Sequence, residues 1–138
     1  MRLRNGLGPA SRGSVLVEFA LVLPILACLV FGMLGFGQYF LLAHSIQQLA
    51  NDAARATVAG LNSSERDTLA RQSVAAEMGA IRDLNVSRAT TQVTEASGYV
   101  TVTIRYDAGN IAIFHTGLVP LPAATIERSA VARLGGGA

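Results

Sequence analysis

Apolar residues dominate the chain from about Val15 to Leu42, and no formally charged residue occurs between Phe19 and Asn51. A helix needs about 20 predominantly apolar residues to cross the hydrocarbon core of a bilayer. The run is therefore long enough to span a membrane. We expect a transmembrane helix whose membrane part covers about residues 15–42.

The helical period continues past the apolar run into SIQQLANDAARATVAG, residues 45–60. Here apolar residues recur every three or four positions, and polar residues occupy the other faces. The pattern predicts one continuous helix from about Ser14 to Ala59, ended by Gly60, with an amphipathic second half. The apolar face of that second half consists of Ile46, Leu49, Ala53 and Ala56.

A second helix is predicted from about Ser64 to Ile81. Either Ser63 or Ser64 can cap it, and acidic residues stand in its first turn, where the helix dipole favours them. Its apolar set is modest, so we expect it to pack on a sheet. That set consists of Leu69, Val74, Ala76 and Ile81.

From Asn85 onward β-branched residues become frequent, which favours strands. Residues 86–96 read as a strand or two, residues 96–98 as a turn and residues 99–107 as the clearest strand. A loop with a short apolar element follows, and residues 124–134 form a third strand candidate. One face of the 99–107 strand should cover the second half of the long helix. The apolar residues of that face are Val100, Val102, Ile104 and Tyr106.

These elements predict an α+β fold, in which a long N-terminal transmembrane and amphipathic helix packs on a small antiparallel sheet with a second helix. The composition agrees: of 138 residues, 51% are hydrophobic and 14% charged, with a mean hydropathy of +0.41, which is too apolar for an ordinary soluble domain. Arg2, Arg4 and Arg12 precede the apolar run with no acid among them. This asymmetry predicts a single-pass protein with a cytoplasmic N-terminus and a translocated C-terminal part.

Several classes of function find no support in the sequence. No basic stripe is interleaved with aromatic residues, so we expect no nucleic-acid partner. No nucleophile–base motif or paired carboxylates occur, so we expect neither an enzyme with catalytic residues nor a small-molecule substrate. Cys28 is the single cysteine, and His44 and His115 stand apart from other ligand types, so we expect no metal and no cofactor.

The acid at Glu18, near the start of the apolar run, requires an explanation. An acid at the centre of a membrane helix costs roughly 2.5–3.5 kcal/mol and is usually paired. Asp52 is the next charged residue along the helix, and Arg12 should stay with the headgroups. If the chain were cut between Gly13 and Ser14, the new amine of Ser14 would supply a cation. Glu18 could then neutralise the N-terminus of a neighbouring helix packed alongside.

The stretch RGSVLVEFALVLP, followed by this apolar run, resembles the class III signal of type IV pilin-like proteins. More closely, it resembles the TadE-like minor pilins, or pseudopilins, of tight-adherence (Flp) pilus systems, over about residues 11–60. The resemblance implies that a prepilin peptidase cuts between Gly13 and Ser14. It also implies that Glu18 is the acid needed for assembly, followed by the aromatic Phe19, and that Pro24 bends the helix.

The expected organisation is a cleaved leader at 1–13, a pilin helix at 14–60, a periplasmic or extracellular α+β head at 61–134 and a flexible tail at 135–138. Gly32 and Gly35 belong to a small-residue face that could serve close helix packing. We expect a minor pilin in the bacterial inner membrane that enters an extracellular pilus and acts in adhesion, biofilm formation or secretion. Its implied partners are the prepilin peptidase, other pilins, the inner-membrane assembly platform and membrane lipid.

A second hypothesis remains open on the sequence alone. The chain could be an uncleaved bitopic membrane anchor whose periplasmic head binds a partner. Such an anchor would have no need of Gly13 or Glu18.

Overall fold

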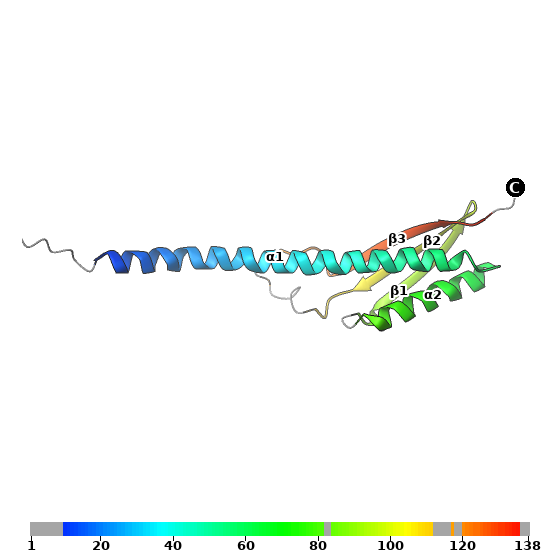
Figure 1. Ribbon diagram of the computed structural model, residues 1–138, viewed down its shortest axis with the longest axis horizontal. Helices are drawn as coiled ribbons and strands as arrows, with labels where there is room; N and C mark the ends of the chain where they lie inside the picture. The colour runs from blue at the N-terminus through cyan, green and yellow to red at the C-terminus, as the bar shows by residue number, and fades with distance from the viewer. Residues whose placement is uncertain (1–9, 82–83, 112–116, 118–119, 136–138) are drawn as a thin grey trace, which may run out of the picture.

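The computed structural model describes residues 10–81, 84–111, 117 and 120–135, with side chains from Gly13 onward. Most of the predicted leader and tail, residues 1–9 and 136–138, and His115 in the long loop lie outside the described residues. The described elements form the predicted α+β arrangement, with two α-helices and a three-stranded antiparallel sheet. The first half of the long helix projects alone, and the other elements gather around its second half (Figure 1).

The long helix α1 runs over Ala10–Thr57, so it begins four residues before the predicted start at Ser14 and ends two residues before the predicted end at Ala59. Once a helix is nucleated, each added residue contributes one hydrogen bond, and nothing in the three residues before Gly13 breaks it. At the other end the N–H groups of residues 58–60 bond to carbonyls three positions back, which tightens and ends the helix.

The second helix α2 spans Ser63–Ala80 and is capped by Asn62, not by Ser63 or Ser64. The Asn62 side chain accepts from the Glu65 N–H at 2.9 Å, and Glu65 Oε2 accepts from the Leu61 N–H at 2.8 Å. Each side chain thus satisfies a backbone donor at the helix start, as in a capping box.

The prediction of which α2 residues form its buried apolar face was wrong for most of them. Of the predicted residues only Val74 is buried, whereas Leu69 is half-buried and Ala76 and Ile81 are exposed. The buried stripe follows the four-residue spacing of one helical face. It also meets α1 as well as β1, not a sheet alone. The stripe consists of Ala70, Val74 and Met78.

The sheet has the strand order β1-β2-β3, with β1 at Ala89–Ala96, β2 at Tyr99–Asp107 and β3 at Thr125–Arg133. The turn of the β1–β2 hairpin is Ser97 and Gly98, both with positive φ (52° and 79°), as a two-residue hairpin turn requires.

The start of the first predicted strand was wrong, because Val86–Arg88 form the 3-10 turn η1. Asn85 Oδ1 accepts from the Ser87 N–H at 2.9 Å, and this local bond competes with extended pairing.

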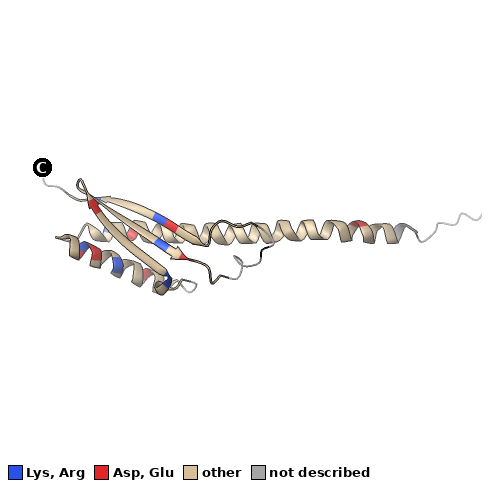
Figure 2. Ribbon diagram, turned by 180° about the vertical axis from the view of Figure 1, so that it is seen from behind, with Lys and Arg blue, Asp and Glu red and all other residues tan. Residues whose placement is uncertain are grey.

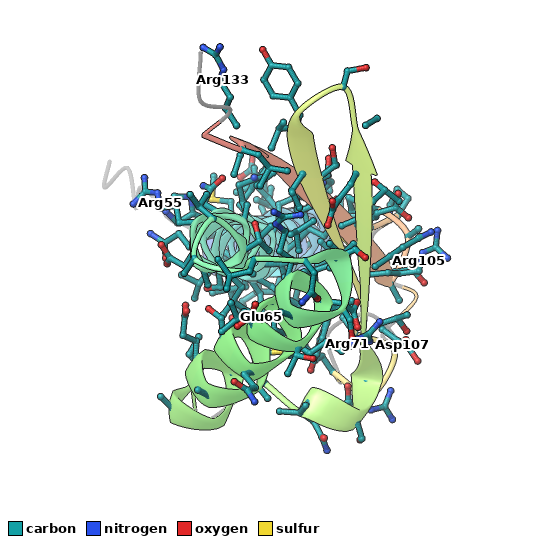
Figure 3. All side chains as sticks on the ribbon, turned by 90° about the vertical axis from the view of Figure 1, so that its right-hand side faces the viewer. Arg55, Glu65, Arg71, Arg105, Asp107 and Arg133 are labelled. Carbon is teal, nitrogen blue, oxygen red and sulfur yellow. The ribbon has the colours of Figure 1, made fainter. Side chains whose placement is uncertain are left out.

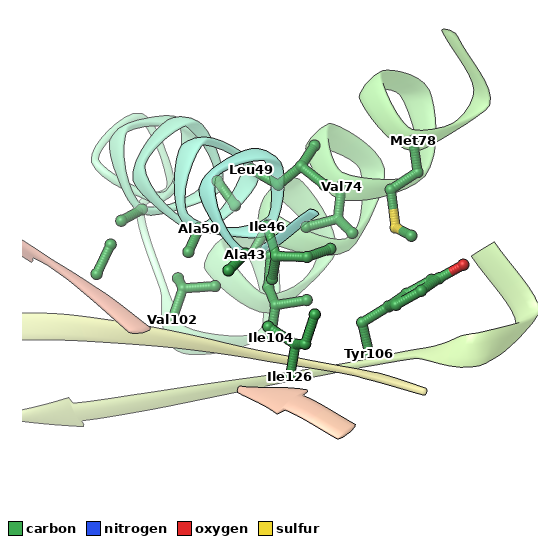
Figure 4. Close-up of a cluster of buried hydrophobic side chains, with 14 of the residues drawn as sticks. Ala43, Ile46, Leu49, Ala50, Val74, Met78, Val102, Ile104, Tyr106 and Ile126 are labelled. Atoms are coloured by element: carbon green, nitrogen blue, oxygen red, sulfur yellow. The ribbon is translucent and has the colours of Figure 1, made fainter. Parts of the chain in front are cut away.

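The core lies between the sheet, the second half of α1 and one face of α2 (Figure 4). The inward-facing residues of β2 are all fully buried, as the alternation predicted, and the predicted face of α1 meets them, with Ala56 only half-buried at its end. Small residues such as Ala50 and Ala53 let the helix approach the sheet closely. The outer face of the sheet is polar, and Arg105 and Asp107 point away from the helices there (Figure 3).

Candidate functional site in the N-terminal half of the long helix

The residues that the sequence singles out around the predicted cut lie on one face of α1. Gly13, Ser14, Val17, Glu18 and Leu21 line this face together and are all exposed. Ser14 and Glu18 are four residues apart in a continuous helix, so their side chains are neighbours on its surface. The structure therefore brings together the predicted cleavage position and the predicted assembly acid.

Glu18 has no ion-pair partner among the described side chains. Glu18 is also the one charged residue in the chain from Gly13 to Asn51, and Figure 2 shows a single acidic position on the projecting part of α1. An acid in an apolar environment without a cation is costly. The arrangement therefore leaves this carboxylate available to a cation from outside the described residues.

The apolar side chains around Glu18 have almost no cover from the rest of the described chain. Phe19 is 60% exposed and Leu16 70% exposed. The described helix Gly13–Thr57 is long and apolar enough to cross a membrane, and its most apolar window has no buried residue. Exposure of this extent marks a surface that a bilayer or other apolar helices must cover.

Pro24 lies inside α1, which continues through it as one element. A proline at this position lacks the N–H that would bond to the carbonyl four residues earlier, which weakens the helix locally. The predicted bend at Pro24 stays a prediction. Of the two glycines predicted for packing, Gly32 is half-buried and Gly35 is buried, while Cys28 on the same helix is exposed.

An aromatic cluster just beyond the middle of α1 was not predicted from the sequence. The rings of Phe36 and Phe40 lie 6.5 Å apart between centroids, and those of Tyr39 and Phe40 lie 5.7 Å apart in an edge-to-face arrangement. Tyr39 is of the residue type that is enriched where a membrane helix meets the headgroups. The signal in the sequence was the helical spacing of these aromatic residues on either side of Gln38, the first polar residue after the uncharged run begins.

The part of the chain that the structure describes contains no group of three or more His, Cys, Asp and Glu side chains that could hold a metal ion.

Residues 13–55 match the model of the family described as TadE-like protein. The match begins at Gly13 and includes Glu18 and Pro24, so the resemblance seen in the residues is confirmed. No curated protein and no solved structure matches the chain. The N-terminal segment is therefore similar to the TadE-like family, and the matched residues end before the head.

Proposed function

We propose that this protein is a minor pilin, or pseudopilin, of a tight-adherence pilus. A prepilin peptidase cuts the chain between Gly13 and Ser14 on the cytoplasmic side of the inner membrane. The mature protein then waits in the membrane as a single-pass subunit with its head in the periplasm. The family match over residues 13–55 carries this proposal.

The exposed apolar half of α1 supports an assembly role. A subunit that leaves the bilayer loses the apolar surroundings of this helix, and the loss is restored only when similar helices pack around it. Because no residue in the most apolar window of this helix is buried in the described chain, the apolar surface of that window is available to the bilayer first and to neighbouring pilins afterwards. A filament core of packed helices provides such apolar surroundings in place of the lipid.

Glu18 supports the same role through its charge. In a filament the carboxylate would meet the positively charged amine of Ser14 on an adjacent subunit. A charge pair in a low-dielectric core is costly to break by removing one partner, roughly 3–5 kcal/mol, so it fixes the axial register of neighbouring helices. Phe19 beside it and the bend at Pro24 would shape the same contact, and Gly32 and Gly35 would allow close packing.

The head supports a minor role and not that of the major subunit, because the chain resembles a TadE-like minor pilin and carries a folded head, whose core is built on the second half of the helix. Its expected partners are the prepilin peptidase, other pilins, the inner-membrane assembly platform and membrane lipid. Adhesion, biofilm formation or secretion would be the downstream outcome of pilus assembly.

The test is a strain that lacks this protein, complemented with the wild type, E18Q or the matched control E77Q, whose glutamate lies on α2. We expect E18Q to be processed to the same mature length as the wild type. Its amount in the sheared pilus fraction, or the number of pili it supports, should fall at least about tenfold, because one lost charge pair is worth more than 1.4 kcal/mol. E77Q should behave as the wild type. Normal pilus formation with E18Q would contradict the assembly role of Glu18.

A further inference from the structure

A groove lies between α1 and β3 at the edge of the head nearest the projecting half of the helix. It is open to solvent, has a volume of about 400 Å³ and is lined by Phe40, Ala43, His44, Gln47 and Arg128. The side of the groove formed by α1 therefore carries an aromatic ring, a methyl group, an imidazole and an amide, and β3 adds a guanidinium. Apolar and cationic side chains in one groove suit a ligand that joins an anionic group to an apolar part.

Arg128 brings a positive charge to the groove that no described carboxylate neutralises. Its Nη1 donates to the backbone oxygen of Glu127 at 2.8 Å, while the carboxylate of Glu127 accepts from Arg105 Nε at 2.9 Å. Arg128 is half-buried, and the ion pairs between described residues do not include it. A partly buried guanidinium in this state has donors left for a planar or tetrahedral oxyanion.

The other polar residues of the groove are held in place by their own bonds. Gln47 Nε2 donates to the backbone oxygen of Ser129 at 3.1 Å, which fixes the helix against β3. The Nε2 of His44 lies 3.2 Å from Gln48 Nε2 on the same helix, so the ring is oriented by a neighbour and its Nδ1 is directed elsewhere. The groove is therefore built by contacts within the chain before any ligand arrives.

The depth of the groove follows from the length of α1. The uncharged run starts at Phe19, and roughly 20 residues of helix, about 30 Å, separate it from Gln38. This length equals the thickness of the hydrocarbon core, so Gln38 lies at its far edge. The interfacial layer is about 5–7 Å thick on each side, which corresponds to about four residues. Tyr39 and Phe40 then lie in this layer. His44, six residues or about 9 Å beyond Gln38, lies at its outer edge, from where the long Arg128 side chain of the same groove can extend toward the lipid phosphates.

We propose that this groove binds the phosphodiester of an anionic lipid in the outer leaflet of the membrane. Arg128 pairs with the phosphate, His44 and Gln47 supply further polar contacts, and Phe40 lies against the glycerol and upper acyl region. The bound lipid holds the head against the membrane surface and is released when the subunit is drawn out. The inference rests on the membrane-spanning orientation in the proposed function, but not on cleavage at Gly13.

The test uses the full chain in a mild, uncharged detergent, with bound lipids counted by native mass spectrometry. The arginines of the N-terminal cluster would also attract anionic lipid, so all variants carry R2Q, R4Q and R12Q. The probes are phosphatidylglycerol, phosphatidylcholine and inorganic phosphate. R128Q is compared with R133Q, which removes the same charge from the C-terminal end of β3, and with R128K, which keeps the charge.

We expect one molecule of phosphatidylglycerol to bind more tightly than phosphatidylcholine. R128Q should weaken this binding roughly fivefold or more, as the loss of a charge-assisted bond implies, whereas R133Q should not and R128K should retain most of it. Inorganic phosphate should not displace the lipid. Equal binding by R128Q and the parent would overturn the proposal. Displacement by inorganic phosphate would also overturn it, because the site would then select a free anion and not a lipid.

Discussion

Gln47 on α1 donates through its Nε2 to the backbone oxygen of Ser129 on β3 at 3.1 Å, across 82 positions in the sequence. The bond joins the long helix to the last strand of the head near the point where the helix leaves the expected membrane. It fixes how the head sits on the helix, and so how the groove beside Arg128 is formed.

Replacing this amide should loosen the head without unfolding it. Q47A removes the bond to Ser129 and a longer bond of 3.4 Å to Asn51 Oδ1 on the same helix. We expect the free energy of unfolding to fall by about 0.5–1.5 kcal/mol, chiefly through the bond to Ser129. The measurement is thermal unfolding of the full chain in detergent, followed by the circular dichroism of the sheet. Q48A is the control, because the bond described for Gln48 is to His44 on the same helix, and it should leave the midpoint nearly unchanged.

The core should respond strongly to a cavity at its centre. The side chain of Ile46 on α1 is fully buried against the sheet. I46A should therefore destabilise the head by about 2–5 kcal/mol in the same unfolding experiment. L41A is the matched control, because Leu41 on the same helix is 65% exposed. If both variants lost equal stability, the assignment of the core to this face of α1 would be incorrect.

Gly60, between α1 and α2, should tolerate no side chain. A Cβ there would lie 2.6 Å from Arg66 Cγ and 3.0 Å from the Arg66 backbone nitrogen. The Arg66 side chain cannot easily withdraw, because its Nη1 donates to Glu95 at 2.9 Å. We expect G60A to cost about 1–3 kcal/mol, as overpacking does.

The control for this overpacking is G79A. A Cβ on Gly79, near the end of α2, meets nothing within 4 Å. Alanine is the better helix former, so G79A should be neutral or stabilise the head by up to about 1 kcal/mol. A neutral G60A would show that the α1–α2 turn is looser than described.

The ion pair between Arg66 and Glu95 should matter more than the exposed pair on α2. The Arg66 and Glu95 side chains are 17% and 28% exposed, whereas those of Arg71 and Asp67 are 54% and 41% exposed. Burial reduces solvent screening, so E95Q should destabilise the head by more than about 1 kcal/mol and D67N by less than about 0.5 kcal/mol. Urea unfolding of the two variants side by side measures the difference.

The sheet was predictable because its pattern is local and simple. Alternation from Tyr99 to Asp107 located β2 to the residue and identified its buried face. The buried stripe of α2 was not predictable in the same way, because Ala70 and Met78 carry little hydrophobic contrast with Ala76 and Leu69. Which face of such a weakly amphipathic helix turns inward is decided by its contact with α1.

The candidate site was also predictable where it depends on local spacing and not where it depends on distant segments. The positions of Gly13, Ser14 and Glu18 on one face follow from helical spacing, so the sequence alone was sufficient for them. The groove at Arg128 could not be predicted, because it depends on β3 returning to lie beside α1 from more than eighty residues away along the chain. Contacts between distant segments of this kind have no counterpart in a local pattern.

Cleavage of the chain by a prepilin peptidase is decided by the intact mass of the protein. The protein would be made with and without the peptidase, as the wild type, G13A and the control G37A. Neither alanine meets another side chain within 4 Å, so neither should disturb the fold. We predict a mature chain starting at Ser14 for the wild type and G37A in the presence of the peptidase, and an uncut chain for G13A. An intact N-terminus in every sample would contradict the account and leave an uncleaved membrane anchor.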